Sequence, residues 1–160
     1  MIEIKQGDAL NGLKEDGLSI VAHGVNCMGK FASGFAAAVA KRYPQAREEY
    51  LDKHRKRGWE LGEVQYSVVR KTNVGKGVIA NCATQYTYGY EGRLYLEYDA
   101  LEDCLKQVFN ITRMCNGKLH MPWIGCGLAG GDKEKVTKII EKVDLYYLNQ
   151  VPCTIWELPK

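Results

Sequence analysis

The sequence lacks any apolar run long enough to span a membrane, and its first residues show no signal-peptide pattern. It also has little excess charge, because 22 basic and 19 acidic residues leave a net charge of +3. The densest basic run, residues 53–57, is interpreted as the solvated end of a helix. We therefore expect a cytoplasmic protein with no membrane partner and no strong affinity for nucleic acid.

Cysteine pairs with metal-ligand spacing are absent, although the chain has six cysteines. None forms a C-x-x-C pair, and no histidine lies at zinc-finger spacing, so we expect no structural metal and no metal cofactor. Reduced thiols are the default without secretory features. Cys27 and Cys126 lie in the two glycine-rich segments, where one could be a reactive thiol, and small buried side chains are the preferred interpretation of both.

The most informative stretch combines a short apolar strand, a glycine-rich loop and a helix. Residues 18–22 are apolar, a loop with three glycines follows, and an alanine-rich run after Ser33 favours a helix. Ser33 stands at the expected N-cap. Glycines allow a close approach of the backbone, and the free N–H groups of a first helical turn bind anions. A tight turn without a ligand remains the alternative interpretation.

A second segment repeats this layout. The apolar residues before Gly125 predict a strand, four glycines follow it, and Asp132 is placed to cap a helix that begins near Lys133. The two loops would meet at the carboxyl edge of the sheet, where open α/β sheets bind ligands, and together they suit a diphosphate. Neither loop ends in Lys-Ser/Thr or fits G-x-G-x-x-G with a suitably placed acid, which disfavours ATPases and standard dinucleotide dehydrogenases.

The remaining periodicity predicts an α/β protein with one domain over residues 1–160. Apolar and alternating runs predict strands at residues 2–5, 18–22, 63–70, 77–82, 118–122 and 153–158. Helical spacing predicts helices at residues 34–42, 44–57 and 94–115 and from about residue 133. We expect a three-layer α/β/α sandwich with a mixed, about six-stranded central sheet.

Four motifs in the chain resemble those of the macro domains, which bind ADP-ribose. They are Gln6-Gly-Asp8, His23-Gly-Val-Asn-Cys27 with its loop, residues 79–85, and residues 121–132. They occur in the family's order and span nearly the whole chain. The chain looks most similar to the branch that includes the ADP-ribose-1″-phosphate phosphatases.

The resemblance implies a role for each matching position. It implies that Asp8, beside Gly7, accepts a hydrogen bond from the adenine amino group, and that Asn26 binds the distal ribose. The two loops would supply backbone donors to the distal ribose and the diphosphate. The implied ligand-binding residues of these loops are Gly29, Ser33, Gly34, Gly125, Cys126, Gly127, Leu128, Ala129 and Gly130.

The candidate catalytic residues are Asn26, His23 and Asp132. His23 could act as a general acid or base, or brace the loop. Asp132 could polarise water or only cap a helix, and Asn26 could be a turn-forming residue. The preferred hypothesis is a phosphatase acting on ADP-ribose 1″-phosphate. The alternatives are a non-enzymatic reader of ADP-ribose, free or attached to macromolecules, and a de-ADP-ribosylase or O-acetyl-ADP-ribose deacetylase.

Two positions depart from related hydrolases. Some macro domains that remove ADP-ribose look to use a lysine where this chain has Gln85, and one type has an acid where it has Ala129. Both differences weigh against a mechanism with a lysyl intermediate. Five aromatic residues are candidates for stacking on adenine: Tyr86, Tyr88, Tyr90, Trp123 and Trp156.

Overall fold

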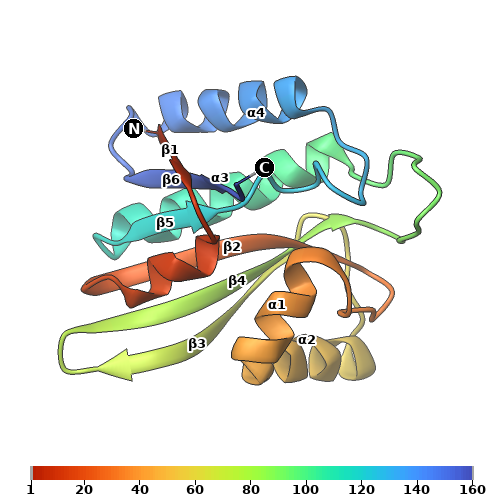
Figure 1. The fold of residues 1–160 in the computed structure, drawn as a ribbon, viewed down its shortest axis with the longest axis horizontal. Helices are drawn as coiled ribbons and strands as arrows, with labels where there is room; N and C mark the ends of the chain where they lie inside the picture. Colours follow the sequence, from red (N-terminus) through yellow and green to blue (C-terminus); the bar gives the residue numbers. More distant parts are fainter. Residues whose placement is uncertain (1, 160) are drawn as a thin grey trace.

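A six-stranded sheet with the order β1-β6-β5-β2-β4-β3 runs through the computed structural model (Figure 1). Neighbouring strands are parallel except β3, which pairs antiparallel with β4. The structure describes residues 2–159, so the ends of the predicted domain, Met1 and Lys160, lie outside the described residues. The predicted three-layer sandwich with a mixed sheet is confirmed.

The elements follow one another with short connections. The strands are β1 (Ile2–Gln6), β2 (Gly17–Asn26), β3 (Val64–Thr72), β4 (Gly75–Gln85), β5 (Lys118–Met121) and β6 (Cys153–Glu157). The helices are the 3₁₀ helix η1 (Ala9–Lys14), α1 (Gly34–Arg42), α2 (Pro44–Lys56), α3 (Tyr98–Met114) and α4 (Lys133–Tyr146).

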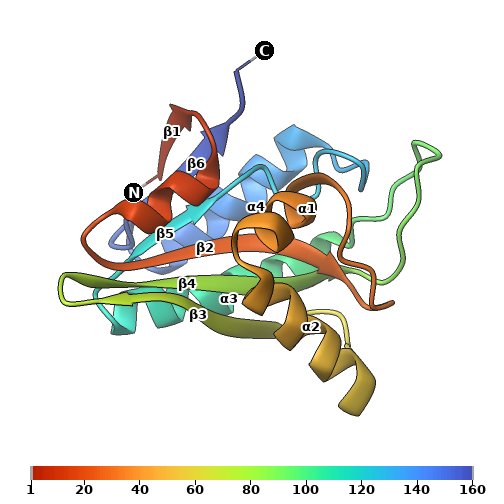
Figure 2. The same cartoon turned by 60° about the horizontal axis from the view of Figure 1, so that its bottom comes forward.

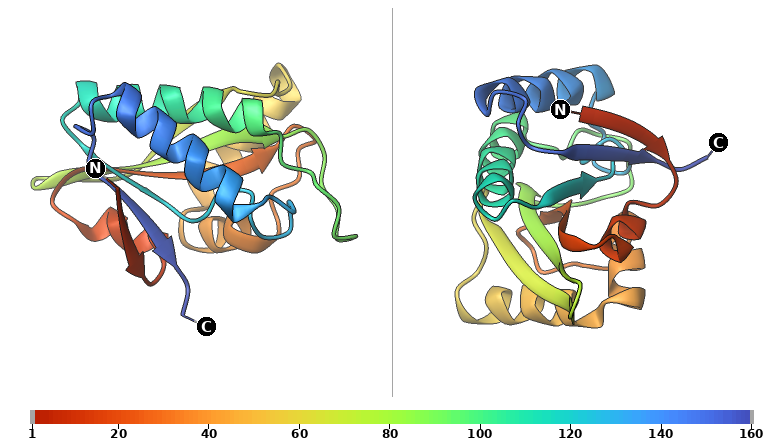
Figure 3. Two further views of the ribbon diagram at one scale, coloured as in Figure 1. Left: turned by 90° about the horizontal axis from the view of Figure 1, so that it is seen from above. Right: turned by 90° about the vertical axis from the view of Figure 1, so that its left-hand side faces the viewer.

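Each face of the sheet carries its own hydrophobic core. Helices α3 and α4 cover one face, and η1, α1 and α2 cover the other (Figure 3). Phe109 and Leu105 of α3 are fully buried on the first face, and Tyr50 of α2 is fully buried on the second. Burying such side chains contributes about 2–3 kcal/mol each, so the two cores fix the helices against the sheet.

The parallel strands bring three connections to one edge of the sheet. β2, β4 and β5 all end at this edge, where residues 27–33, 86–97 and 122–132 leave the sheet. The connection after β4 projects beyond the sheet as a long green loop (Figure 2). Ligands bind at the carboxyl edge in open α/β sheets, so the fold places both glycine loops where the sequence predicted them.

Three predicted boundaries differ from the structure by three or four residues, and one of them is the end of β4, which lies at Gln85 instead of Cys82. β2 continues to Asn26 instead of ending at Ala22, because backbone pairing with β4 carries it through Gly24. α3 begins at Tyr98 instead of Leu94, because residues before it form an extended segment. In that segment Leu96 bridges Gln85, and its N–H donates to the Ala129 carbonyl at 3.1 Å.

Candidate functional site

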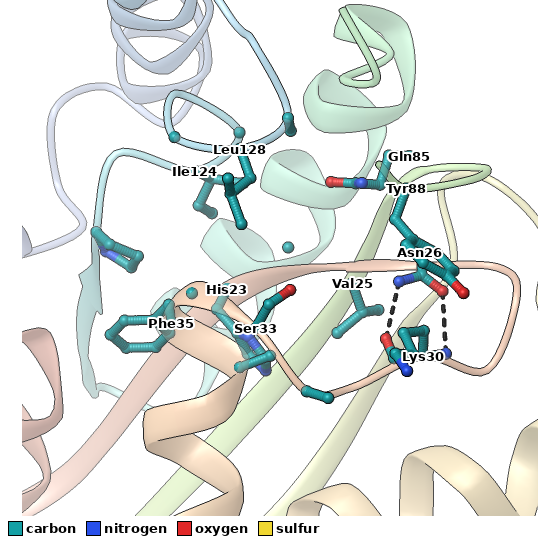
Figure 4. Close-up of a pocket in the computed structure, with 18 of the residues that line it drawn as sticks. His23, Val25, Asn26, Lys30, Ser33, Phe35, Gln85, Tyr88, Ile124 and Leu128 are labelled. Carbon is teal, nitrogen blue, oxygen red and sulfur yellow. Dashed lines mark hydrogen bonds between the residues drawn. The ribbon is translucent and has the colours of Figure 1, made fainter. Parts of the chain in front are cut away.

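A cavity of about 240 Å³ lies between the two glycine loops and the connection after β4. His23, Ser33 and Phe35 lie on one side of it, and Ile124 and Leu128 lie on the other (Figure 4). The predicted site residues that line it are His23, Asn26, Ser33, Gly34, Gly125, Gly127, Leu128 and Ala129. Those that do not are Gly7, Asp8, Gly29, Cys126, Gly130 and Asp132.

Asn26 ends β2 and holds the first loop in shape. Its Nδ2 donates to the Lys30 carbonyl at 2.8 Å, and its Oδ1 accepts from the N–H groups of Met28 at 3.0 Å and Lys30 at 3.3 Å. These bonds agree with the turn-forming interpretation, and ribose binding by Asn26 stays a prediction. An amide nitrogen has two N–H bonds, so the second N–H of Asn26 is available to a ligand in the cavity.

Tyr50 of α2 holds Asn26 in place through hydrogen bonds. Its role at the site was not identified from the sequence. Its buried hydroxyl donates to the Asn26 carbonyl at 2.6 Å and accepts from the Gly29 N–H at 3.1 Å. Desolvation raises the pKa of Tyr50 to about 12, so the hydroxyl keeps its proton. A tyrosine in the middle of an amphipathic helix carries no signal that its hydroxyl reaches a loop 24 residues earlier.

His23 lines the cavity but is almost completely buried, with 1% of its surface exposed. Its ring lies 5.4 Å from the Phe31 ring and 5.6 Å from the Phe35 ring, between centroids. Desolvation lowers the pKa of His23 to about 4, against an opposing contribution from a hydrogen bond to Asn81. The imidazole is therefore neutral near pH 7 and cannot serve there as a proton donor of ordinary strength.

The bond to Asn81 fixes the tautomer of this neutral ring. His23 Nε2 lies 2.6 Å from Asn81 Oδ1, while Asn81 Nδ2 donates to Gln65 Oε1 at 3.2 Å and to the Ala46 carbonyl at 3.3 Å. Since the amide oxygen faces His23, Nε2 must carry the proton. Nδ1 is then the proton-accepting nitrogen, and it is buried without a hydrogen-bond partner in the described chain.

The amino terminus of α1 faces the cavity. Ser33 occupies the N-cap position in extended conformation, but its side chain makes no capping hydrogen bond. Gly34, Phe35 and Ala36, which begin the helix, line the cavity. The unsatisfied N–H groups of this first turn, together with the positive end of the helix dipole, favour an anion.

The second loop is held by backbone bonds of its own. The Gly131 N–H donates to the Gly125 carbonyl at 2.7 Å, and the Ala129 carbonyl accepts from Tyr95 at 2.7 Å. Gly125 has a φ of 76°, and a Cβ there would lie 2.6 Å from Leu96 Cδ1. A glycine is thus required at this position for both conformation and space.

Asp132 caps α4 and lies outside the cavity lining. Its Oδ1 accepts from the Glu134 N–H at 2.9 Å, and its own N–H donates to the Tyr98 hydroxyl at 3.0 Å. The predicted N-cap role is confirmed. The predicted catalytic role stays a prediction, with no contact to the cavity in its favour.

Gly7 and Asp8 lie at the end of β1, on the α1 side of the sheet. The Asp8 carboxylate caps η1 through the Leu10 N–H at 2.9 Å and lies 3.6 Å from Arg42 Nη1. Gly7 has a φ of 137°, and the Trp156 ring packs within 3.3 Å of the position a Cβ would take. Neither residue lines the cavity, so their proposed contact with adenine remains a prediction.

Aromatic side chains surround the cavity, including three of the five predicted candidates. Tyr88, Tyr90 and Trp123 line it, whereas Tyr86 and Trp156 do not. Phe35 also lines it and was missed, because a phenylalanine in an alanine-rich helix is typical of a core position. Gln85 also lines the cavity, and its Nε2 donates to the Thr87 carbonyl at 2.8 Å.

Residues 2–159 contain no group of three or more His, Cys, Asp or Glu residues arranged to hold a metal ion. No helix in this range is long and apolar enough to cross a membrane. Cys27 is buried and desolvation raises the pKa of its thiol to about 11, while desolvation also raises that of Cys126, so neither is an activated nucleophile.

Comparison with known proteins supplies the family. The family model for the Macro domain matches residues 22–140, which include both glycine loops. The ADP-ribose 1″-phosphate phosphatase of Lodderomyces elongisporus is 27% identical over 145 residues, covering 87% of this chain and 90% of that protein. A Bacteroides thetaiotaomicron protein of unknown function has a TM-score of 0.83 at 30% identity, covering 98% of this chain and 97% of its own. A Streptomyces coelicolor macrodomain protein has a TM-score of 0.78 at 26% identity, covering 98% and 99%.

Proposed function

The chain belongs to the macro domain family, and on this premise we propose that it binds ADP-ribose and hydrolyses the 1″-phosphate of ADP-ribose 1″-phosphate. The observation that carries the proposal is the lining of the cavity. Two glycine loops and a helix amino terminus surround it, and its described lining contains no aspartate or glutamate. Such surroundings suit a diphosphate, because backbone N–H groups stabilise its charge and no carboxylate repels it. The name of the Lodderomyces relative supports the phosphatase.

In the proposed complex each loop binds a different part of the ligand. The backbone of residues 125–130 donates to the diphosphate, and the first loop, with Gly29, Ser33 and Gly34, donates to the distal ribose and the neighbouring phosphate. The free N–H of Asn26 points to the distal ribose, which brings the 1″ oxygen into the cavity. Asp8 accepts a hydrogen bond from the adenine amino group.

The proposed reaction transfers the phosphoryl group to water. The water oxygen forms a bond to phosphorus, the bond between phosphorus and the 1″ oxygen breaks, and a proton from water ends on the leaving oxygen. His23 and Asp132 are the two candidates for this proton transfer. His23 can take part only as an acceptor through Nδ1, because its pKa of about 4 leaves it neutral.

Phosphate release from ADP-ribose 1″-phosphate tests the proposal directly. We expect release by the native protein, and a fall of about 100-fold or more in Asn26→Ala, which removes the amide that orients the ribose. Asn73→Ala, in the turn between β3 and β4, is the control and keeps native turnover. A native protein that releases no phosphate excludes the phosphatase.

A reader of ADP-ribose is the second candidate, and one observation favours it. Of the two residues predicted to transfer a proton, His23 is almost completely buried, and Asp132 lies outside the cavity lining. Tight binding of ADP-ribose with no phosphate release would establish this function. Loss of label from an ADP-ribosylated protein would instead assign the de-ADP-ribosylase activity, and release of acetate from O-acetyl-ADP-ribose would assign the deacetylase activity.

A further inference from the structure

Lys30 is the one lining residue with a full charge near pH 7 in the described part of the cavity. The rest of that lining contains no Arg, Asp or Glu, and burial keeps His23 neutral. A cavity wall without carboxylates leaves the Lys30 ammonium uncompensated. The charge balance of the wall thus favours an anion.

The backbone holds Lys30 beside Asn26. The Lys30 carbonyl accepts from Asn26 Nδ2 at 2.8 Å, and the Lys30 N–H donates to Asn26 Oδ1 at 3.3 Å (Figure 4). Tyr50 braces the same turn through the Asn26 carbonyl. The Lys30 side chain therefore leaves the backbone next to Asn26, the residue that we assign to the distal ribose.

The Lys30 ammonium is also free within the described chain. It makes no ion pair there, whereas Lys53, Lys133 and Lys142 each contact a carboxylate at 2.7 to 3.1 Å. Lys30 is exposed, so its flexible stem can bring the ammonium to a ligand without first breaking a bond to the protein. The three paired lysines would have to give up a partner to do the same.

We propose that Lys30 is a specificity-determining residue that selects ligands with an anionic group on the 1″ oxygen. This inference rests on the proposed function, because that function places the distal ribose at Asn26. The diphosphate is common to all ADP-ribose ligands, so its contacts cannot distinguish among them. A cation beside the distal ribose strengthens binding only when the 1″ oxygen carries a phosphate, which adds nearly two negative charges.

The test compares two ligands on matched variants. ADP-ribose is titrated against an ADP-ribose 1″-phosphonate, in which carbon replaces the bridging oxygen so that the probe resists hydrolysis. We expect the native protein to prefer the phosphonate about tenfold at low salt, as for a hydrogen bond to a charged group. Lys30→Met loses this preference and keeps its affinity for ADP-ribose, while Lys30→Arg retains the preference.

The control variant also replaces a lysine by methionine, but at a position far from the cavity. Lys76 is exposed on β4 in the hairpin at the opposite end of the sheet, so Lys76→Met keeps the native preference. Added salt lowers the native preference, because screening weakens the contact with an exposed cation. Equal affinity of the native protein for both ligands overturns the inference, as does a preference that survives in Lys30→Met. In both cases binding of ADP-ribose stands, whereas absence of any ADP-ribose binding contradicts the proposed function itself.

Discussion

Asn26 and His23 lie three residues apart on β2, yet their side chains have different surroundings. The Asn26 amide is bonded to the first loop and retains an N–H for the cavity. His23 points into the core formed with α1 and α2, where its proton-bearing nitrogen is committed to Asn81. The Asn26 side chain is placed to contact a ligand, whereas the His23 side chain connects β2 to β4 through Asn81.

The pKa of His23 makes folding sensitive to acid. Unfolded histidine titrates near 6.5, whereas burial lowers the folded pKa to about 4. Between these values the unfolded chain binds a proton that the folded chain does not, so stability is lost as the pH falls from about 6.5 toward 4. Relative to pH 7, we expect His23 to lower the free energy of unfolding at pH 5 by roughly 2 kcal/mol.

Urea unfolding at the two pH values measures this effect. His23→Gln keeps a hydrogen-bonding side chain and removes the titration, so its free energy of unfolding should change less between pH 7 and pH 5. An NMR titration of the native imidazole gives the pKa independently. A midpoint at 6.5 or above would contradict the assignment of a buried neutral ring.

Replacing either of two cavity glycines by alanine should have different effects, one on stability and the other on ligand binding. A Cβ on Gly89 would overlap the Tyr95 hydroxyl, which donates to Glu91 Oε2 at 2.6 Å, so Gly89→Ala should lower the free energy of unfolding by about 1–3 kcal/mol. A Cβ on Gly127 meets open space. Gly127→Ala should therefore fold with native stability but bind ADP-ribose more weakly, because the methyl group occupies ligand space.

Thermal unfolding and ADP-ribose titration of both variants separate the two effects. Native affinity in Gly127→Ala would mean that the diphosphate does not approach this part of the second loop. Native stability in Gly89→Ala would mean that Gly89 does not lie against the Tyr95 hydroxyl as the structure places it.

The helices α1 and α4 begin at the two glycine loops with different caps. Asp132 accepts a hydrogen bond from α4, whereas Ser33 makes none to α1. We expect Asp132→Ala to lower the free energy of unfolding by about 1 kcal/mol and Ser33→Ala by a few tenths. Chemical denaturation of the two variants measures the difference, and equal losses would contradict it.

The same variants separate capping from chemistry. If Asp132 is only a cap, Asp132→Ala keeps native phosphate release once compared at a temperature where both proteins are folded. If Asp132 transfers a proton, release falls while ADP-ribose still binds. Ser33→Ala serves as the comparison, because it alters the ligand side of α1 with little change in stability.

Elements with a clear period could be predicted from the sequence, whereas their ends could be predicted only where a local cap, proline or glycine marks them. The apolar stripe of α4 and the cap at Asp132 gave the helix and its start. Leu94 and Tyr98 lie at helical spacing, yet the segment around Leu94 is extended because backbone groups of the second loop bond to Tyr95 and Leu96. Periodicity does not reveal such long-range bonds, and β2 extends through Gly24 for the same reason.

The candidate site also has parts that could be predicted from the sequence and parts that could not. Glycine loops have a local signal, and both proved to border the cavity. Tyr50 has no such signal, and Asn81 lies in a matching motif without a predicted role, because both roles depend on contacts with residues 24 and 58 positions away. The supports of the site could therefore be found only once the helices and strands were placed in space.

At the scale of the whole molecule, the parallel sheet brings distant segments to one cavity. The connections after β2, β4 and β5 meet at the same edge although they begin near residues 27, 86 and 122. The wall they form depends on both cores, since α1 packs on one face and α4 on the other. A ligand that contacts both glycine loops would therefore report on the packing of the whole sheet.

Because β6 lies between β1 and β5, β1 can join the sheet only after β6 has been synthesised. A ribosome makes residues 2–6 early and residues 153–157 roughly 8–30 s later, at synthesis rates of about 5–20 residues per second. Through that interval β1 lacks its neighbour β6, and between the synthesis of β5 and that of β6 the edge of β5 is open to other nascent chains. Gly7, whose N–H donates to the Glu157 carbonyl at 2.7 Å, therefore reaches its final place only after β6 has been synthesised.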